Sequence, residues 1–526
     1  MSAVSSPDLA PLAEKPWLAG LSEAQRQVAS FRAGPQLVTA GPGSGKTRTL
    51  CAWIVELIRS GAARPDEILA VTFTRRAARE LHERLSVLLG TETEQLVMGT
   101  FHRLALRLSP LPPTLRVGDE SARLQLMETA SIGSGTRKSP ASLLLLLSLR
   151  KGQYPDFRER LQSAELLLSI EESQVFRRYE QLLAEHGLID LDDLLLRALD
   201  ALRDGSALCG FRFVAVDEYQ DVSATQRALV VRLGQSAIVL AIGDPDQAIY
   251  AFRGGEVRHF RGFVDDFPGA VSRFLIENYR STPQIVMASA AVIAKNSQRS
   301  ASPPKPQLPS GSSLLLWRNA GVFAEAQRLV REIERLIGGS SLLSHDRRQT
   351  ASWQGGSYGF ADIAILTRTV SRADAIAKAL GEAGLPFSRP SQARRPVGQP
   401  GELATEVSEP VYESDQLEDQ RIALLTLHGA KGLEFGVVFV AGLEAAQLPG
   451  PGRSEEERQE ERRLFYVGMT RAKELLYLSY VDSVPAAASA RTESVPSPFL
   501  REVPSELLIT ETAPKKRPQK PQLRLF

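Results

Sequence analysis

Residues 40–47, with the sequence AGPGSGKT, are the feature that most constrains how this chain can fold. They lie between a short apolar run and a helical pattern that begins at Arg48. This order is typical of a phosphate-binding loop, because glycines let backbone N–H groups turn towards phosphate oxygens. Lys46 supplies a positive charge for the β and γ phosphates, and the Thr47 hydroxyl can ligate Mg²⁺. The segment therefore predicts a nucleoside triphosphate site, although Ala40 stands where the pattern has its first Gly.

Composition narrows the class of protein. With 526 residues, 43% hydrophobic and 24% charged, the chain resembles a soluble globular protein of two or more domains. Its two cysteines, Cys51 and Cys209, are too few for a disulfide framework or a zinc site, which favours a reducing, cytoplasmic setting. Residues 1–20 lack a signal-peptide pattern and the apolar run 143–147 is too short to span a bilayer, so we expect no membrane partner. The net charge of +2 excludes a uniformly basic DNA-coating protein.

Apolar runs alternate with helical patterns along the chain, which predicts an α/β fold with parallel sheets. Three runs fit a first sheet and five later runs fit a second: residues 68–71, 213–216 and 238–242, then 314–316, 363–366, 422–425, 437–440 and 475–478. Residues 104–202 instead show helical periodicity and read as a helical insertion in the first α/β domain. The chain beyond residue 500 reads as mostly disordered.

Two acidic residues follow the predicted strand 213–216. Asp217 and Glu218 stand at its carboxyl end, where the ligand crevices of parallel α/β sheets form. Asp217 can hold Mg²⁺ and Glu218 can polarise an attacking water. An acidic surface turn would be the favoured interpretation of this pair by itself, but the phosphate-binding loop makes it the less favoured one.

Residues 243–254 form a second loop after a predicted strand. Gln247 can sense the γ phosphate of a nucleotide, while Tyr250, Phe252 and Arg253 can meet a second ligand. The two aromatic side chains could instead belong to the core. Their alternation with polar residues and glycine favours a loop that presents them.

Six further segments occur in a recognisable order: residues 21–26 (LSEAQR), 71–78 (VTFTRRAA), 99–102 (GTFH), 278–281 (NYRS), 426–435 (TLHGAKGLEF) and 467–473 (VGMTRAK). With the loops above, they resemble the motif series of the UvrD/Rep-type superfamily 1A DNA helicases over most of residues 21–500. In combination the motifs are specific. The resemblance implies two RecA-like motor domains that use ATP and Mg²⁺ to move along single-stranded DNA in the 3′-to-5′ direction.

The resemblance also implies an ATP site shared by the two motor domains. Lys46, Glu218, Gln247, Arg280 and Arg471 would be its catalytic residues, with the two arginines acting as fingers on the γ phosphate when ATP closes the cleft between the domains. Thr47 and Asp217 would hold Mg²⁺. Nucleotide would be bound by Gln25, which reads adenine, and by Gly41, Pro42, Gly43, Ser44, Gly45, Lys46, Thr47, Arg48, Tyr279, Arg280, Glu434 and Arg471.

The implied DNA contacts come from both motor domains and are Phe73, His102, Tyr250, Phe252, Arg253, His428 and Phe499. Aromatic side chains stack on bases without reading sequence, at roughly 1–3 kcal/mol per base. Phe252 stands where the family usually has Trp, which keeps a stacking face of smaller area. Single-stranded and tailed duplex DNA are the expected partners.

Family members carry a large helical accessory subdomain, called 2B, inside the second motor domain. In this chain only residues 388–420 remain for it, too few to bury a core. The predicted organisation is a first motor domain at 1–103 and 205–276, its helical 1B insertion at 104–204, a second motor domain at 277–387 and 421–500, a short linker at 388–420 in place of 2B, and a disordered basic tail at 501–526. Translocation should survive without 2B, and strand separation is the activity at risk.

The chain ends in apolar residues after a basic, proline-rich stretch. Gln522, Leu523, Leu525 and Phe526 resemble the bacterial sliding-clamp-binding peptide, in which Gln-Leu-any-Leu-Phe docks extended in an apolar pocket. A tail that packs on its own protein is the simpler alternative. The terminal position on a DNA motor favours the clamp as a partner.

These predictions converge on an ATP-dependent 3′-to-5′ single-stranded DNA translocase and helicase in DNA repair or replication. One alternative is a translocase that displaces proteins without processive unwinding. Another is a nucleotide-switched DNA-binding scaffold, although the intact Lys46, Glu218, Arg280 and Arg471 argue against it. A small-molecule P-loop kinase is disfavoured by the second motor-like domain.

Overall fold

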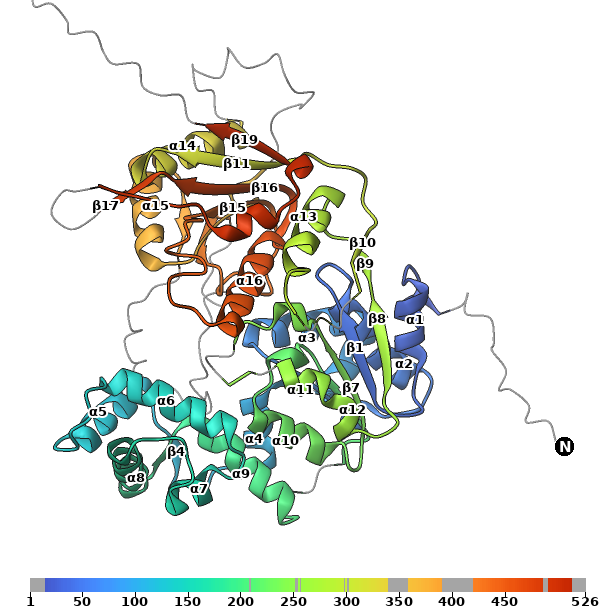
Figure 1. Ribbon diagram of the computed structural model, residues 1–526. Coiled ribbons are helices and arrows are strands. Elements are labelled where there is room, and N and C mark those ends of the chain that lie inside the picture. The colour runs from blue at the N-terminus through green and yellow to red at the C-terminus, as the bar shows by residue number, and fades with distance from the viewer. Residues whose placement is uncertain are drawn as a thin grey trace, which may run out of the picture. The chain divides into compact units, whose positions relative to one another are not determined.

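The computed structural model describes residues 15–207, 210–250, 254–255, 257–297, 299, 302–338, 358–389, 420–485 and 491–512. These residues form two compact units (Figure 1). Unit 1 contains the described residues up to Ile276 together with Ser302, and unit 2 contains the others from Glu277 onwards. None of the described helices is long and apolar enough to cross a membrane.

Unit 1 is built on a parallel sheet of six strands in the order β3-β2-β6-β7-β1-β8. The strands are β1 (Gln36–Ala40), β2 (Ile68–Thr72), β3 (Val97–Thr100), β6 (Phe213–Val216), β7 (Ile238–Gly243) and β8 (Val271–Leu275). The three strands predicted for the first sheet are confirmed. The two edge strands, β3 and β8, were not predicted, because edge strands need no continuous apolar run.

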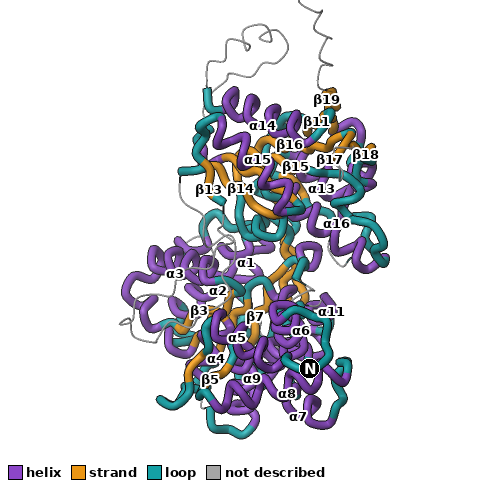
Figure 2. The backbone as a smooth tube through the Cα atoms, turned by 90° about the vertical axis from the view of Figure 1, so that its left-hand side faces the viewer, coloured by secondary structure: helices purple, strands orange, loops and turns teal. Residues whose placement is uncertain are grey.

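Helices cover both faces of this sheet (Figure 2). Successive side chains of a strand point to opposite faces, so Val38 packs with Trp53 on one face while Leu37 belongs to the core on the other. The first face is covered by α2 (Lys46–Arg59) and α3 (Arg75–Leu89), and the second by α4 (Phe101–Leu108), α9 (Leu191–Arg203) and α10 (Ala224–Leu233). The carboxyl ends of the strands therefore emerge at one edge of a three-layer domain.

A helical segment lies between β3 and β6 in the chain. It contains α5 (Glu120–Ser131), α6 (Pro140–Gln153), α7 (Phe157–Ser163), α8 (Ile170–Glu185) and the short paired strands β4 (Arg116–Val117) and β5 (Leu188–Ile189). Met127, Leu147, Phe176 and Tyr179 lie at the centre of an apolar cluster separate from the cores of the sheet. This segment, called the helical insertion below, therefore has its own hydrophobic core.

Unit 2 has a second parallel sheet, of seven strands in the order β13-β14-β12-β15-β16-β11-β19. They are β11 (Leu314–Asn319), β12 (Ile363–Thr367), β13 (Phe387–Ser388), β14 (Ile422–Thr426), β15 (Phe435–Ala441), β16 (Ala472–Val481) and β19 (Leu508–Thr512). Helices α14 (Val322–Leu336) and α15 (Val370–Glu382) share a core with one face of the sheet, and α13 (Pro283–Ile293) packs against α16 (Glu455–Met469). The predicted α/β class with two parallel sheets is confirmed.

The prediction that the chain is disordered from residue 501 is wrong for residues 501–512. Arg462 of α16 makes two hydrogen bonds to the Glu502 carboxylate, at 2.8 and 2.9 Å, and lies over the ring of Phe499. Strand β19 then pairs in parallel with β11, and Arg328 bonds to Glu511. Strand β19 was missed because its apolar part is only Leu508 and Ile509, followed by Thr510, Glu511 and Thr512, and an edge strand needs no longer apolar run.

Two other predicted segments lie outside the described residues. These are nearly all of the 388–420 linker, of which only residues 388–389 and 420 are described, and the end of the tail, 513–526, with its clamp-like peptide.

Two truncated chains should distinguish the structural role of residues 501–512 from that of the residues after them. A chain that ends at Leu500 should lose about 3–5 kcal/mol of unfolding free energy in unit 2, because the buried Arg462 guanidinium loses its carboxylate partner. A chain that ends at Thr512 keeps Glu502 and β19 and should match the full chain. Urea unfolding combined with hydrogen exchange of the β11 amides measures both. Equal stability of the two truncated chains would contradict the structural role of residues 501–512.

Candidate nucleotide-binding site

The phosphate-binding loop connects β1 to α2, and its glycines adopt the backbone conformations that the loop requires. Gly43 and Gly45 have φ of 69° and 79°, the left-handed region that favours glycine. A Cβ atom on Gly45 would lie 2.6 Å from Gln25 Nε2. Ser44 closes the loop, donating from its backbone N–H and its hydroxyl to the Gly41 carbonyl, at 3.3 and 2.7 Å. The sequence predicted a helix from Arg48, whereas α2 begins two residues earlier and brings its amino end to the loop.

Lys46 begins α2, and its ammonium group lies across the loop. Its Nζ atom donates to the Ala40 carbonyl at 3.3 Å. The departure at Ala40 is therefore harmless, since the site uses the backbone carbonyl of that residue and its small side chain is buried in the sheet. Thr47 follows in the first turn of α2, where its hydroxyl has the position along the loop that a Mg²⁺ ligand needs.

Gln25 ties the loop to the amino-terminal helix α1 (Glu23–Ser30). Its side chain accepts from the Ser22 backbone N–H at 2.9 Å and donates to the Ser44 carbonyl at 2.8 Å. Ser22 caps the helix by accepting from the Gln25 backbone N–H. Arg48 donates to the Ala19 carbonyl at 3.0 Å. Gln25, the predicted adenine reader, and Arg48, predicted to bind nucleotide, therefore connect the loop to the start of the described chain.

Carboxyl groups converge at the ends of two neighbouring strands, β6 and β7. Burial and then the charge of Glu218 raise the pKa of Asp217 to about 7, partly offset by the Lys46 ammonium. Burial and the charge of Asp246 raise the pKa of Asp244 to about 6. Carboxylate oxygens are the ligands that Mg²⁺ prefers, and a cation would stabilise the ionised forms that burial and neighbouring charge disfavour. Asp217 therefore fits the predicted magnesium ligand.

Gln220 holds this acidic cluster together, and the sequence reasoning missed it. Its side chain is fully buried, and Nε2 donates to the Glu218 carboxylate at 2.5 Å while Oε1 accepts from the Asp244 backbone N–H at 2.9 Å. A Cβ atom at position 243 would lie 2.2 Å from that Oε1 atom, so Gly243 is required for the bridge. Gln247 donates to the Asp244 carboxylate at 2.7 Å. Gln220 lies within the acidic motif itself, and this position is the signal by which the sequence could have indicated it.

Glu218 has the backbone conformation of a constrained residue. Its φ is +51°, which is uncommon for a side chain other than glycine and occurs mostly where the surrounding structure enforces it. The Asp217 carboxylate accepts from the Glu218 backbone N–H at 2.9 Å. With Gln220 on its carboxylate, Glu218 is held at both its backbone and its side chain, as a general base needs to be.

Two predicted DNA contacts of unit 1 lie against each other. The rings of Phe73 and Tyr250 are stacked, with centroids 5.4 Å apart and 19° between their planes. Phe73 follows β2 and is partly exposed, whereas Tyr250 is mostly buried. Phe73 is therefore the face of the pair that a base can reach. His102 lies in the first turn of α4, and Phe252 and Arg253 lie outside the described residues.

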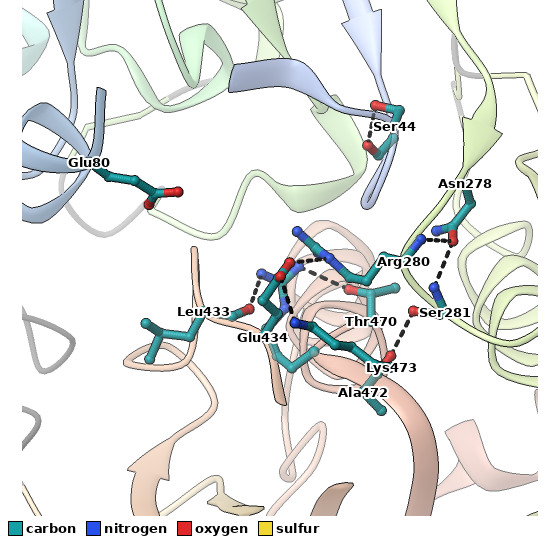
Figure 3. A network of polar contacts seen from close by, with 12 residues as sticks. Ser44, Glu80, Asn278, Arg280, Ser281, Leu433, Glu434, Thr470, Ala472 and Lys473 are labelled. Atoms are coloured by element: carbon teal, nitrogen blue, oxygen red, sulfur yellow. Dashed lines mark hydrogen bonds and ion pairs between the residues drawn. The ribbon is translucent and has the colours of Figure 1, made fainter. Parts of the chain in front are cut away.

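In unit 2, Glu434 lies between two cations (Figure 3). Its carboxylate contacts Arg280 at 2.5 Å and Lys473 at 2.8 Å. Burial alone would raise the pKa of Glu434, but the charge of Arg280 and the hydrogen bond from Lys473 hold it below its ordinary value. The Asn278 side chain accepts from the backbone N–H groups of Arg280 and Ser281, at 3.0 and 2.9 Å. Three predicted motifs therefore meet within this unit.

The remaining predicted residues of unit 2 differ in exposure. Tyr279 is 46% exposed, so its ring is free to pack against a ligand, and His428 follows β14 and is partly buried. Arg471 is buried and donates to the carbonyls of Val467 and Leu433, at 2.9 and 3.1 Å. Its action as a second arginine finger stays a prediction.

Phe499 is fully buried and stacks on Phe465, with ring centroids 6.3 Å apart. The structure gives this side chain a place in the core instead of on the predicted DNA-binding surface. The sequence around Phe499 does not show whether its ring is buried or exposed, because the residues that cover the ring are remote in the chain.

A parallel sheet with a phosphate-binding loop after β1 defines unit 1 as a P-loop nucleotide-binding domain. Residues 21–268 match the UvrD/REP helicase N-terminal domain, and residues 274–394 and 404–483 match the UvrD-like helicase C-terminal domain. The chain belongs to the UvrD/Rep helicase family.

Its similar proteins include bacterial helicases. The ATP-dependent DNA helicase PcrA of Bacillus subtilis (strain 168) is 26% identical over 642 aligned positions, covering 93% of this chain and 86% of that protein. PcrA of Staphylococcus epidermidis is 25% identical over 651 positions, covering 95% and 89%. PcrA of Leuconostoc citreum is 30% identical over 386 positions, covering 70% and 49%. The two longer alignments exceed the 526 residues of this chain, so those relatives contain residues that it lacks.

The raised pKa of Asp217 predicts a pH-dependent need for Mg²⁺. A carboxyl group with a pKa of about 7 holds its proton at pH 6 and loses it by pH 8, and only the ionised form binds the cation. The free Mg²⁺ concentration that half-activates ATP hydrolysis should therefore fall about tenfold from pH 6 to pH 8. Asp217→Asn should need more Mg²⁺ and lose this dependence. A midpoint that is independent of pH in the wild type would contradict the assignment.

Proposed function

We propose that the protein is an ATP-dependent single-stranded DNA translocase and DNA helicase of 3′-to-5′ polarity, acting in the cytoplasm in DNA repair or replication. The observation that carries this proposal is the convergence of Lys46, Asp217, Glu218 and Gln247 at one edge of the unit 1 sheet, with Gln220 holding Glu218 in place. Family membership and the PcrA relatives support the same activity.

The residues of unit 1 suit hydrolysis of a nucleoside triphosphate. The loop N–H groups and Lys46 bind the phosphates, and Thr47 and Asp217 would hold Mg²⁺, which neutralises phosphate charge when bound. Glu218 accepts a proton from the attacking water, and Gln220 orients its carboxylate. Gln247 senses the γ phosphate from its position on Asp244.

Unit 2 supplies the predicted partners of this chemistry. Arg280 carries the charge for the γ phosphate and is held by Glu434 in the structure, so it is positioned without being buried. Tyr279 next to it has the exposed ring that packing on adenine needs. Arg471, which is hydrogen bonded to the Leu433 carbonyl next to Glu434, is the proposed second arginine finger. Phe73 and Tyr250 in unit 1 and His428 in unit 2 are proposed to contact single-stranded DNA.

Two observations favour the alternative of a translocase that displaces proteins without processive unwinding. The match to the C-terminal helicase domain is interrupted between residues 394 and 404, and the aligned relatives are longer. We propose that residues 388–420 replace the 2B subdomain by a short linker. Translocation would then persist, while duplex unwinding would be reduced.

Nucleotide hydrolysis should be stimulated by single-stranded DNA and should depend on Lys46. Lys46→Ala should lower kcat by about 100-fold or more, because the positive charge that stabilises the transferred phosphate is lost. The wild type should unwind duplexes with a 3′ tail and leave those with a 5′ tail intact.

Three outcomes would decide between the proposals. Hydrolysis that ignores DNA, or no hydrolysis at all, would exclude the motor. Unwinding from a 5′ tail only would reverse the polarity. Movement that strips a bound protein from single-stranded DNA without unwinding would select the translocase. Lys138→Met, which removes an exposed charge from the helical insertion, is the matched control for loss of a lysine.

The clamp proposal rests on the terminal peptide alone, which lies outside the described residues. Replacing Leu525 and Phe526 by Ala should abolish capture by a bacterial sliding clamp, because the apolar anchors of an extended peptide supply its affinity. Arg524→Ala, at the variable position, is the matched control and should be captured as the wild type is. Surface plasmon resonance with immobilised clamp measures both, and undiminished capture of the double variant would remove the clamp from the partners.

A further inference from the structure

Helix α6 of the helical insertion ends with a backbone carbonyl that its own helix does not satisfy. The partner of the Lys151 carbonyl would be the N–H group four residues later, but that residue is Pro155, which has none. The Thr225 hydroxyl of α10 donates to the Lys151 carbonyl instead, at 2.7 Å, and both residues are buried. This hydrogen bond joins the helical insertion to the sheet domain of unit 1.

The side chain of Lys151 fixes the end of α6 on its other side. Its ammonium group contacts the carboxylates of Glu180, Asp190 and Asp193, at 2.6, 2.7 and 2.8 Å, and is fully buried. Asp190 and Asp193 also cap the first turn of α9. The three carboxylates have the spacing of a metal site, but Lys151 lies among them, so they form an ion-pair cluster. The end of α6 is therefore rigidly attached to α8 and α9.

Thr225 is the second residue of α10, close to the residues that act on ATP. The helix is capped by Ser223, and the chain before it runs directly back to Glu218. The end of α6 also backs the loop that carries Tyr250. A Cβ atom on Gly254 would lie 3.7 Å from the Leu149 side chain and 3.8 Å from Ser223. The end of α6 is thus bonded to α10, the helix that follows the Glu218 segment, and lies near Gly254 in the loop that carries Tyr250.

We infer that Thr225 is a positioning residue through which the helical insertion couples DNA on the Tyr250 loop to the placement of Glu218. The inference rests on the proposed function. Because the Lys151 cluster holds α6 still, a load on the Tyr250 loop is resisted by α6 and is passed to α10 through the Thr225 hydrogen bond. This hydrogen bond takes no part in the basal hydrolysis of ATP, and it matters only for the stimulation of hydrolysis by DNA.

Thr225→Val in the full chain tests this inference, since it removes the hydroxyl and keeps the shape. The ratio of hydrolysis rates with and without single-stranded DNA should fall by about three- to tenfold, the factor that corresponds to one ordinary hydrogen bond. The basal rate and the KM for ATP should stay close to those of the wild type. Thr225→Ser restores a hydroxyl and should rescue stimulation. Thr129→Val is the matched control, because the Thr129 hydroxyl also donates to a helix carbonyl, that of Gln125, but on the exposed side of α5.

The readouts separate the inference from the proposed function and from a loss of stability. A wild type whose hydrolysis ignores DNA overturns the proposed function together with the inference. A stimulated wild type with equally stimulated Thr225→Val overturns the inference alone. A Thr225→Val protein that loses basal and stimulated rates in the same proportion also overturns it, since destabilisation lowers both rates equally. Thermal unfolding of each variant is the control, and the assay temperature should lie below the unfolding transition of each.

Discussion

The hydrogen bonds of one buried amide, that of Gln220, hold the site of unit 1 together. Its two ends face opposite partners, a carboxylate on the β6 side and a backbone N–H on the β7 side. An amide suits this place because it donates and accepts at once without adding charge to a region that already contains several buried carboxyl groups. The position of Glu218 follows from this bridge, and the bridge itself depends on the close approach that Gly243 allows.

The carboxyl groups of the candidate site have opposite pKa shifts in the two units. In unit 1, burial and the charge of a neighbouring carboxylate raise the pKa of Asp217 and of Asp244. This acidic cluster is a place that suits a cation. In unit 2 a single carboxylate, Glu434, serves two cations, Arg280 and Lys473, and its pKa is lowered. Just as the acidic cluster around Asp217 suits a cation, the two cations around Glu434 leave a local excess of positive charge that suits an anion.

Strands with buried faces were readable from the sequence, whereas strands at edges were not. The central strands of both sheets are continuous apolar runs, because parallel strands are covered on both faces. Strand β19 contains Thr510, Glu511 and Thr512, and its order comes from pairing with β11 and from the Arg462 contact to Glu502, partners remote in the chain. Phe499 was misjudged for the same reason, since only packing shows that its ring is covered by Arg462.

The sequence by itself determined the fold class, the phosphate-binding loop and the types of residue that carry the chemistry. Such features are local, because a glycine-rich turn between a strand and a helix encodes its own geometry. Tertiary structure alone decided which polar groups became partners: Gln220 with Glu218, Arg280 with Glu434, and Thr225 with the carbonyl that Pro155 leaves without a helical donor. Hydrogen bonds and ion pairs depend on distances between remote segments, and those distances exist only after the chain has packed.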